Sequence, residues 1–290
     1  MILRNTKWIG KSRLHFEEID STNKKAKELT QEGGEHGVLI TADTQTAGVG
    51  RRGRSWSSEP GAGIYMSVIL RPNLQPNQAP MLTLVVALAV AKAISDYYKE
   101  QENLEGLPHI EMGVSPAKRD LSNLSQRKVI KKLPCKIKWP NDIVINGKKI
   151  CGILTEMTLN QSQIEAIILG IGINVSNTCF PEEIVSTASS LYLETGFKWE
   201  KELLIENIWK WFEIYYERFL EDGDLRNLKT EYEVFLVNKN EKVNVLDPHG
   251  EYTGVAKGIT NTGELLVDTE IEVKSVSSGE VSVRGIYGYV

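Results

Sequence analysis

The segment richest in chemical groups is a loop of small and basic residues at positions 47–56, Ala-Gly-Val-Gly-Arg-Arg-Gly-Arg-Ser-Trp. Its glycines let the backbone approach a ligand closely, and its arginines offer forked donors that match phosphate. Trp56 adds a flat face on which a base can stack. The pattern indicates a nucleotide site, although a flexible basic surface loop has the same composition. A Walker P-loop is excluded because G-x-x-x-x-G-K-[ST] is absent, and no G-x-G-x-x-G stands between a strand and a helix.

Three further segments place polar groups beside a predicted turn or strand end. Lys138-Trp139-Pro140-Asn141-Asp142 surrounds a proline, whose fixed φ can hold neighbouring side chains in set directions. Lys148-Lys149 follows the turn of a predicted hairpin, where a lysine facing a glycine-lined pocket can neutralise phosphate. Gly170-Ile171-Gly172-Ile173-Asn174 combines small residues with an amide that can read a base edge. Each segment also has a plain structural interpretation, as a turn, a solvated surface or a packed strand.

Several common chemistries find no support in the sequence. The histidines are too scattered for a metal site or a His-based mechanism; they are His15, His36, His109 and His249. The odd number of cysteines, without a C-x-x-C pair, gives neither a disulfide framework nor a zinc knuckle; they are Cys135, Cys151 and Cys179. A G-x-S-x-G elbow or other hydrolase signature is also absent. We expect reduced thiols and no dedicated protein metal site.

Hydrophobic periodicity predicts the elements that must position these residues. Asp20-Ser21-Thr22-Asn23 supplies capping residues before a helix at 24–31 that stops at a Gly-Gly pair. Residues 38–45 and 64–70 alternate as strands, so residues 46–60 form a loop between two strands. Because a glycine-rich loop can close over a bound ligand, we expect residues 46–58 to be mobile without ligand.

The middle of the chain predicts a buried helix followed by consecutive strands. Residues 79–98 are apolar on more than one face, whereas the polar stretch 100–133 is expected to be a surface insertion. Residues 143–157 predict a hairpin around the type I′ turn pair Asn146-Gly147, and residues 164–171 predict the next strand.

The length of 290 residues favours about two domains. Residues 199–220 and 225–235 have helical spacing of apolar residues, and from position 243 the pattern changes to short strands separated by turn signals. We expect a first domain at 1–236 and a small all-β domain at 237–290.

Composition excludes several classes of protein. A formal net charge of −4 argues against a polycation that coats nucleic acid or membrane. The longest apolar run, residues 81–91, is too short for a membrane span and predicts a buried helix. The first residues lack the features of a secretory signal, so we expect a cytoplasmic protein without a membrane partner.

The order of the motifs is more specific than any single motif. Ser-Thr-Asn at 21–23 precedes Gln-Thr-Ala-Gly-x-Gly-Arg-Arg-Gly-Arg-x-Trp at 45–56, Lys-Trp-Pro-Asn-Asp at 138–142, Lys-x-x-Gly-Ile-Leu-x-Glu at 149–156 and Gly-Ile-Gly-Ile-Asn at 170–174. This series closely resembles the biotin protein ligases. The resemblance implies an α+β fold, with a mixed central β-sheet flanked by helices and a small C-terminal SH3-like β-barrel.

The resemblance also implies a reaction in two steps. Biotin and ATP, with Mg²⁺, form biotinyl-5′-AMP and release pyrophosphate, and a lysine of a biotin carboxyl carrier protein then attacks the mixed anhydride. The implied partner is such a carrier, for example a subunit of acetyl-CoA carboxylase. Charge developing on the α-phosphate must be stabilised, which suits lysine, arginine and Mg²⁺.

Matching positions imply roles for individual residues. Those implied to bind biotin are Ser21, Thr22, Asn23, Gln45, Gly48, Val49, Gly50, Arg51, Lys149 and Gly152. Those implied to bind ATP or the adenylate are Arg51, Arg54, Trp56, Asn141, Lys149 and Asn174. The implied catalytic residues are Lys149, Arg51 and Asp142, where Asp142 orients the incoming amine or the metal. Gln45 is expected to pair with a ureido N–H.

One position departs from the pattern of the family. Many members have Gly-Arg-Gly-Arg where this chain has Gly48-Val49-Gly50-Arg51, so one loop arginine is missing. If that position acts mainly through its backbone N–H, the change has little effect; if the guanidinium helps to retain the adenylate, this chain holds its adenylate less tightly.

Two other functions compete with this interpretation. A lipoate or octanoate ligase shares the architecture but lacks the arginine loop and the Lys-Trp-Pro-Asn-Asp turn. A non-catalytic nucleic-acid-binding module could use Arg51, Arg52 and Arg54 on phosphate, but the net charge argues against it. About fifteen residues precede the first motif strand, too few for a helix-turn-helix, so we expect no DNA binding. The sequence leaves the acceptor's identity and the choice between monomer and homodimer open.

Overall fold

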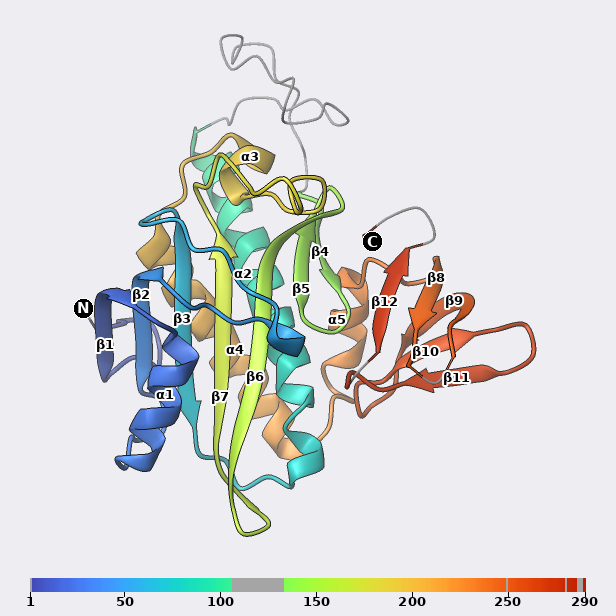
Figure 1. Ribbon diagram of the computed structural model, residues 1–290, viewed down its shortest axis with the longest axis horizontal. Helices are drawn as coiled ribbons and strands as arrows, with labels where there is room; N and C mark the ends of the chain where they lie inside the picture. Colours follow the sequence, from blue (N-terminus) through green and yellow to red (C-terminus); the bar gives the residue numbers. More distant parts are fainter. Residues whose placement is uncertain (1, 106–132, 249, 280, 286–288) are drawn as a thin grey trace.

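A mixed seven-stranded sheet forms the centre of the larger part of the molecule (Figure 1). The computed structural model describes residues 2–105, 133–248, 250–279, 281–285 and 289–290. The strand order is β1-β2-β3-β7-β6-β5-β4, in which β1 and β2 are parallel and the other neighbours are antiparallel. The strands are β1 (Arg13–Ile19), β2 (Leu39–Gln45), β3 (Gly63–Leu70), β4 (Cys135–Lys138), β5 (Asp142–Ile145), β6 (Lys148–Asn160) and β7 (Gln163–Asn174). The predicted strands in this part of the chain are therefore confirmed.

Helices cover both faces of this sheet because its central strands are apolar on both sides. Successive residues of β3, Val68 and Ile69, belong to two different buried clusters, as the pleat requires. α1 (Thr22–Gln31) covers the smaller cluster, and α2 (Met81–Glu105) and α4 (Lys201–Asp222) pack together on the other face (Figure 1). The shorter elements are α3 (Leu191–Thr195), α5 (Lys229–Phe235) and the 3₁₀ turns η1 (Arg51–Gly53) and η2 (Pro76–Gln78). The helix predicted at 225–235 begins only at Lys229, because Leu225 and Leu228 form a turn in which Leu225 N–H donates to the carbonyl of Asn261.

Helix α2 lies in the core of the molecule. By length and composition, Pro76–Gln101 could cross a membrane, but most of this segment is buried among the other elements, as expected of a core helix. The prediction of a buried helix at 81–91 is confirmed. The first residues of the stretch 100–133 are helical, because α2 continues to Glu105 through residues several of which favour helix, and that this stretch is a surface insertion stays a prediction. Residues 106–132 of that prediction lie outside the described residues.

The C-terminal part is a separate antiparallel sheet of five strands in the order β11-β10-β9-β8-β12 (Figure 1). Its strands are β8 (Lys242–Leu246), β9 (Tyr252–Ile259), β10 (Leu265–Asp268), β11 (Val273–Val276) and β12 (Ser282–Gly285). This sheet agrees with the predicted small SH3-like domain, and the predicted fold class is confirmed. The exact boundary between residues 236 and 237 stays a prediction.

Two of the contacts between this sheet and the larger domain involve β4 and the turn after it. Nε1 of the buried Trp139 donates a 2.9 Å hydrogen bond to the carbonyl of Gly263. The Val237 N–H donates to the carbonyl of Ile137, also at 2.9 Å. Both contacts begin from β4 or the turn after it, so the C-terminal sheet stands beside the Lys-Trp-Pro-Asn-Asp turn.

Candidate active site

Two cavities with shared walls lie where the β2–β3 loop passes the ends of β5, β6 and β7. The larger has a volume of about 270 Å³ and the smaller about 50 Å³. Their common lining residues are Gly50, Arg51, Trp56, Asn141 and Lys149. The loop, the turn and the hairpin that the sequence singled out therefore meet at one place.

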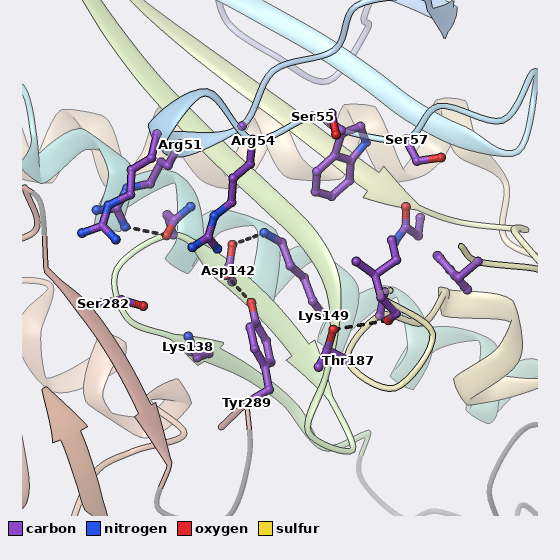
Figure 2. A pocket seen from close by; sticks show the side chains of 18 of the residues that line it. Arg51, Arg54, Ser55, Ser57, Lys138, Asp142, Lys149, Thr187, Ser282 and Tyr289 are labelled. Carbon is purple, nitrogen blue, oxygen red and sulfur yellow. Dashed lines mark hydrogen bonds and ion pairs between the residues drawn. The ribbon is translucent and has the colours of Figure 1, made fainter. Parts of the chain in front are cut away.

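Local structure explains how these segments present their side chains. The β2–β3 loop folds back on itself, since the Gly50 N–H donates to Arg54 O at 2.7 Å and the Trp56 N–H donates to Gly48 O at 2.9 Å. Figure 2 shows Arg51 and Arg54 reaching from this loop into the larger cavity. The β5–β6 turn has positive φ at both central residues, Asn146 and Gly147, as a type I′ turn requires, and it confirms the predicted hairpin.

The smaller cavity has polar walls at the start of α1. Ser21 caps this helix, with its side chain accepting from the Lys24 N–H. Thr22 donates to Oε1 of Gln45 from its N–H at 2.8 Å and from its hydroxyl at 3.1 Å. Thr22 thus occupies both lone pairs of Oε1 of Gln45. The amide nitrogen of Gln45 is left to donate to a ligand.

Two further polar side chains, Ser67 and Glu156, organise this end of the site. Ser67 is fully buried on β3 and its hydroxyl lies 2.6 Å from Oδ1 of Asn23. The amide nitrogen of Asn23 donates to Glu156 on β6 at 2.8 Å, and Lys27 pairs with the same carboxylate at 2.5 Å. Neither residue was among the predicted site residues, although Ser67 is a polar residue within an apolar strand and Glu156 ends the Lys-x-x-Gly-Ile-Leu-x-Glu motif.

Glycines form the floor beneath Trp56. A Cβ on Gly152 would lie 2.7 Å from Cζ3 of Trp56, and one on Gly172 would lie 2.8 Å from Cε2 of the same ring. Any larger residue would therefore displace the indole. Trp56 is therefore one wall of the smaller cavity, whose volume of about 50 Å³ is narrow beside the 270 Å³ of the larger one.

The larger cavity is strongly basic. Its cationic lining residues are Arg51, Arg52, Arg54, Lys138, Lys149 and Arg284. Nη1 of Arg51 donates to Oδ1 of Asn141 at 2.9 Å, and Nη2 donates to the carbonyl of Gly279 at 2.9 Å. Such a concentration of fixed positive charge suits a polyphosphate.

A buried carboxylate, Asp142, balances part of this charge. Its Oδ1 lies 2.7 Å from Nζ of Lys149, and its Oδ2 accepts a hydrogen bond from the hydroxyl of Tyr289 (Figure 2). Burial acts to raise the pKa of Asp142, but the charges of Lys149 and Lys138 outweigh it, so this pKa lies below its ordinary value. Burial also lowers the pKa of Lys138 to about 8, although Asp142 opposes that change. Asp142 is therefore ionised at neutral pH.

The described residues contain no group of three or more His, Cys, Asp or Glu that could hold a metal ion. A divalent cation at this site would be held mainly by oxygen atoms of a bound molecule. The acidic residues that line the larger cavity are Asp142 and Glu59.

Comparison with known proteins identifies the family. The sequence matches the biotin/lipoate A/B protein ligase family over residues 15–174, and the biotin protein ligase C-terminal domain over residues 240–284. The chain belongs to the biotin/lipoate A/B protein ligase family. The bifunctional ligase/repressor BirA of Bacillus subtilis (strain 168) is 32% identical over 280 residues, 96% of this chain and 76% of that protein. The biotin--[acetyl-CoA-carboxylase] ligase of Mycobacterium tuberculosis is 28% identical over 256 residues, 84% of this chain and 78% of that protein.

A solved structure supports the same assignment to the ligase family. The biotin protein ligase from Aquifex aeolicus in complex with biotin and ATP has a TM-score of 0.72 at 30% identity, covering 95% of this chain and 99% of that chain. The family expected from the motif order is confirmed.

In this ligase-family chain, the structure brings together nearly all residues that the motifs singled out. Those lining the smaller cavity are Ser21, Thr22, Asn23, Gln45, Val49, Gly50, Arg51, Trp56, Asn141, Lys149 and Gly152. Those lining the larger cavity are Gly50, Arg51, Arg54, Trp56, Asn141, Asp142, Lys149 and Asn174. Gly48 lines neither; it supports the site through the hydrogen bond to Trp56.

The C-terminal part of this ligase-family chain contributes a wall that none of the sequence motifs includes. Val281, Ser282, Val283, Arg284 and Tyr289 all line the larger cavity. No local pattern marks them, because they reach the site only through the packing of one domain against the other.

Proposed function

We propose that this chain is an ATP-dependent biotin protein ligase. In the first step, a carboxylate oxygen of biotin attacks the α-phosphorus of ATP, and pyrophosphate leaves. In the second step, the ε-amine of a lysine on a biotin carboxyl carrier protein attacks the acyl carbon, an amide bond forms and AMP leaves. Homologues that carry this ligase name support the assignment.

The observation that carries the proposal is the junction of the two cavities. Lys149 and Arg51 line both the narrow polar cavity and the wide basic one. A carboxylate arriving from one side and a polyphosphate from the other would meet beside these cations. Bringing two anions together and stabilising charge on the α-phosphate is the main catalytic task of adenylation.

We assign the narrow cavity to biotin. Ser21, Thr22 and Gln45 supply hydroxyl and amide groups along its wall, and the polar ureido group needs such partners once it is buried. The glycine floor at Gly152 and Gly172 allows close approach of the apolar chain. Seating biotin requires the indole of Trp56 to leave this floor.

We assign the wide cavity to ATP. Arg51, Arg54 and Lys138 face the phosphates, and Asn174 lies on the wall where the base would bind. Mg²⁺ bound to the phosphates would supply further charge neutralisation. Asp142 is placed to orient the acceptor amine, because its carboxylate lies beside Lys149 at the junction. We place this activity in the cytoplasm, where the substrate carrier proteins and ATP are found together.

Pyrophosphate release tests the proposal. The full-length chain is mixed with MgATP and then with biotin, lipoate or octanoate at equal concentrations. We expect a biotin-only burst close to one equivalent of enzyme, followed by labelling of a purified carrier domain on its lysine. Release with lipoate instead would move the chain to the lipoate branch of the family, and no release with any acid would overturn the proposed function.

A further inference from the structure

The phenol of Tyr289 connects the C-terminal part of the chain to the acidic group of the active site. Its hydroxyl donates to Oδ2 of Asp142, while Nζ of Lys149 lies 2.7 Å from Oδ1 of the same carboxylate (Figure 2). Asp142 is only 8% exposed, so the hydrogen bond from Tyr289 to Oδ2 and the ion pair of Oδ1 with Lys149 set the direction of its carboxylate.

Two contacts hold Tyr289 in place. Nζ of Lys138 lies 4.3 Å from the centre of the Tyr289 ring. The next residue, Val290, packs on the β5–β6 turn, where its Cγ2 lies 3.1 Å from the position that a Cβ on Gly147 would take. The hydroxyl therefore comes from a fixed ring, beside the hairpin that carries Asp142 and Lys149.

Fixing the carboxylate also fixes Lys149. A carboxyl group held by one donor can turn about the Cβ–Cγ bond, since rotation about that bond is broad. Lysine has a long flexible side chain that must lose freedom to hold one position. With the hydrogen bond from Tyr289 on Oδ2, Oδ1 stays directed at Lys149, and the ion pair keeps the Lys149 amine at the junction of the two cavities.

We propose that Tyr289 is a positioning residue for adenylate formation, acting by fixing the Asp142 carboxylate that holds Lys149. This inference rests on the proposed function and adds to it a residue from outside the motifs. The hydroxyl of Tyr289 itself need not touch either substrate.

The test removes the hydroxyl while keeping the ring. Tyr289→Phe retains the aromatic contact with Lys138. The matched control is Tyr252→Phe, because Tyr252 also stands in the C-terminal domain beneath a lysine, with Nζ of Lys274 4.6 Å from its ring centre, but lines neither cavity. Thermal unfolding of both full-length variants establishes that they fold, and single-turnover formation of biotinyl-5′-AMP is then measured.

We expect Tyr289→Phe to lower the maximal rate of adenylate formation about tenfold, with KM for biotin and for ATP unchanged within about twofold. Tyr252→Phe should behave as the unmodified chain. A merely structural role would instead change KM or the unfolding temperature.

A double-mutant cycle then tests whether Tyr289 acts through Asp142. In an Asp142→Asn background, Tyr289→Phe should lower the rate by less than about twofold. An equal loss in both backgrounds, or an unchanged rate in Tyr289→Phe, would overturn the positioning role while leaving the ligase function intact. An unmodified chain that makes no biotinyl-5′-AMP would overturn the proposed function, and this inference with it.

Discussion

At the scale of single residues, the active site is a set of cations held by protein acceptors. Lys149 pairs with Asp142 at 2.7 Å, and Arg51 donates to Asn141 and to a backbone carbonyl. Each has further N–H donors for a carboxylate or phosphate oxygen, and charge-assisted hydrogen bonds to such anions are strong. Chemistry at the site therefore depends on which acceptors these side chains contact.

Lys149→Ala should lower the rate of biotinyl-5′-AMP formation by about 10²-fold or more, since it removes the charge at the junction of the cavities. The measurement is pyrophosphate release with biotin and MgATP. Lys148→Ala is the control, because Lys148 is the neighbouring residue on β6 and lines neither cavity. Equal rates for the two variants would remove Lys149 from the catalytic residues.

Lys138 should make ATP binding depend on pH. Its pKa is lowered to about 8 by burial, so the amine is protonated below that pH and loses its charge above it. Between pH 7 and pH 9 we expect KM for ATP to rise up to about tenfold, as the protonated fraction falls.

The variant Lys138→Met has no charge to lose at this position. Its KM for ATP should be high and flat from pH 7 to pH 9. A profile for the unmodified chain as flat as that of Lys138→Met would contradict a phosphate contact by this amine.

At the scale of elements, the β2–β3 loop decides whether the narrow cavity is open. Its Trp56 lies on the glycine floor, and the indole Nε1 is buried without a hydrogen-bond partner among the described residues. A buried N–H without a partner is unfavourable. The indole can therefore leave this position at a low cost in free energy. The mobility that we expect of the loop without ligand stays a prediction.

Biotin binding should move Trp56 and change the fluorescence of the protein. The change should be lost in Trp56→Phe, and biotin should associate about tenfold faster with Trp56→Ala if the open form is a tenth of the population. Stopped-flow fluorescence measures both.

Trp211→Phe provides the matched control for this experiment. Trp211 also has a lysine beside its ring, with Nζ of Lys92 at 4.3 Å, but lies away from both cavities. A full fluorescence change in Trp56→Phe would show that biotin leaves the indole in place.

At the scale of the whole molecule, the C-terminal sheet completes a site that the larger domain cannot build alone. Arg284 and Tyr289 line the larger cavity, and the hydrogen bond from Trp139 to Gly263 fastens the two parts together. The geometry of the active site is therefore coupled to the contact between domains.

Trp139→Phe should weaken that coupling. The variant loses the buried hydrogen bond and part of the ring, which should lower the free energy of unfolding by about 1–3 kcal/mol. At about 2–4 °C per kcal/mol, the unfolding temperature should fall by several degrees. Scanning calorimetry should also resolve two transitions. Trp209→Phe is the control, because Nε1 of the buried Trp209 donates to Met66 within the larger domain. An unchanged midpoint for Trp139→Phe would contradict the coupling.

Local signals in the sequence determined most of the secondary structure and the motifs of the site. The cap at Ser21, the turn at Asn146-Gly147 and the loop of glycines and arginines depend on residues within a few positions of one another. Such interactions leave a recognisable pattern, and the order of the motifs was sufficient to indicate the family.

Only the tertiary structure decided what surrounds those motifs. Tyr289 reaches Asp142 across 147 positions of the chain, and Asn23 meets Glu156 across 133. Contacts of this kind depend on how two elements or domains pack, for which neighbouring residues carry no periodic signal. The same reason explains why the sequence identified the cations of the active site and Asp142, but not Ser67, Glu156 and Tyr289, which contact the motif residues from other parts of the chain.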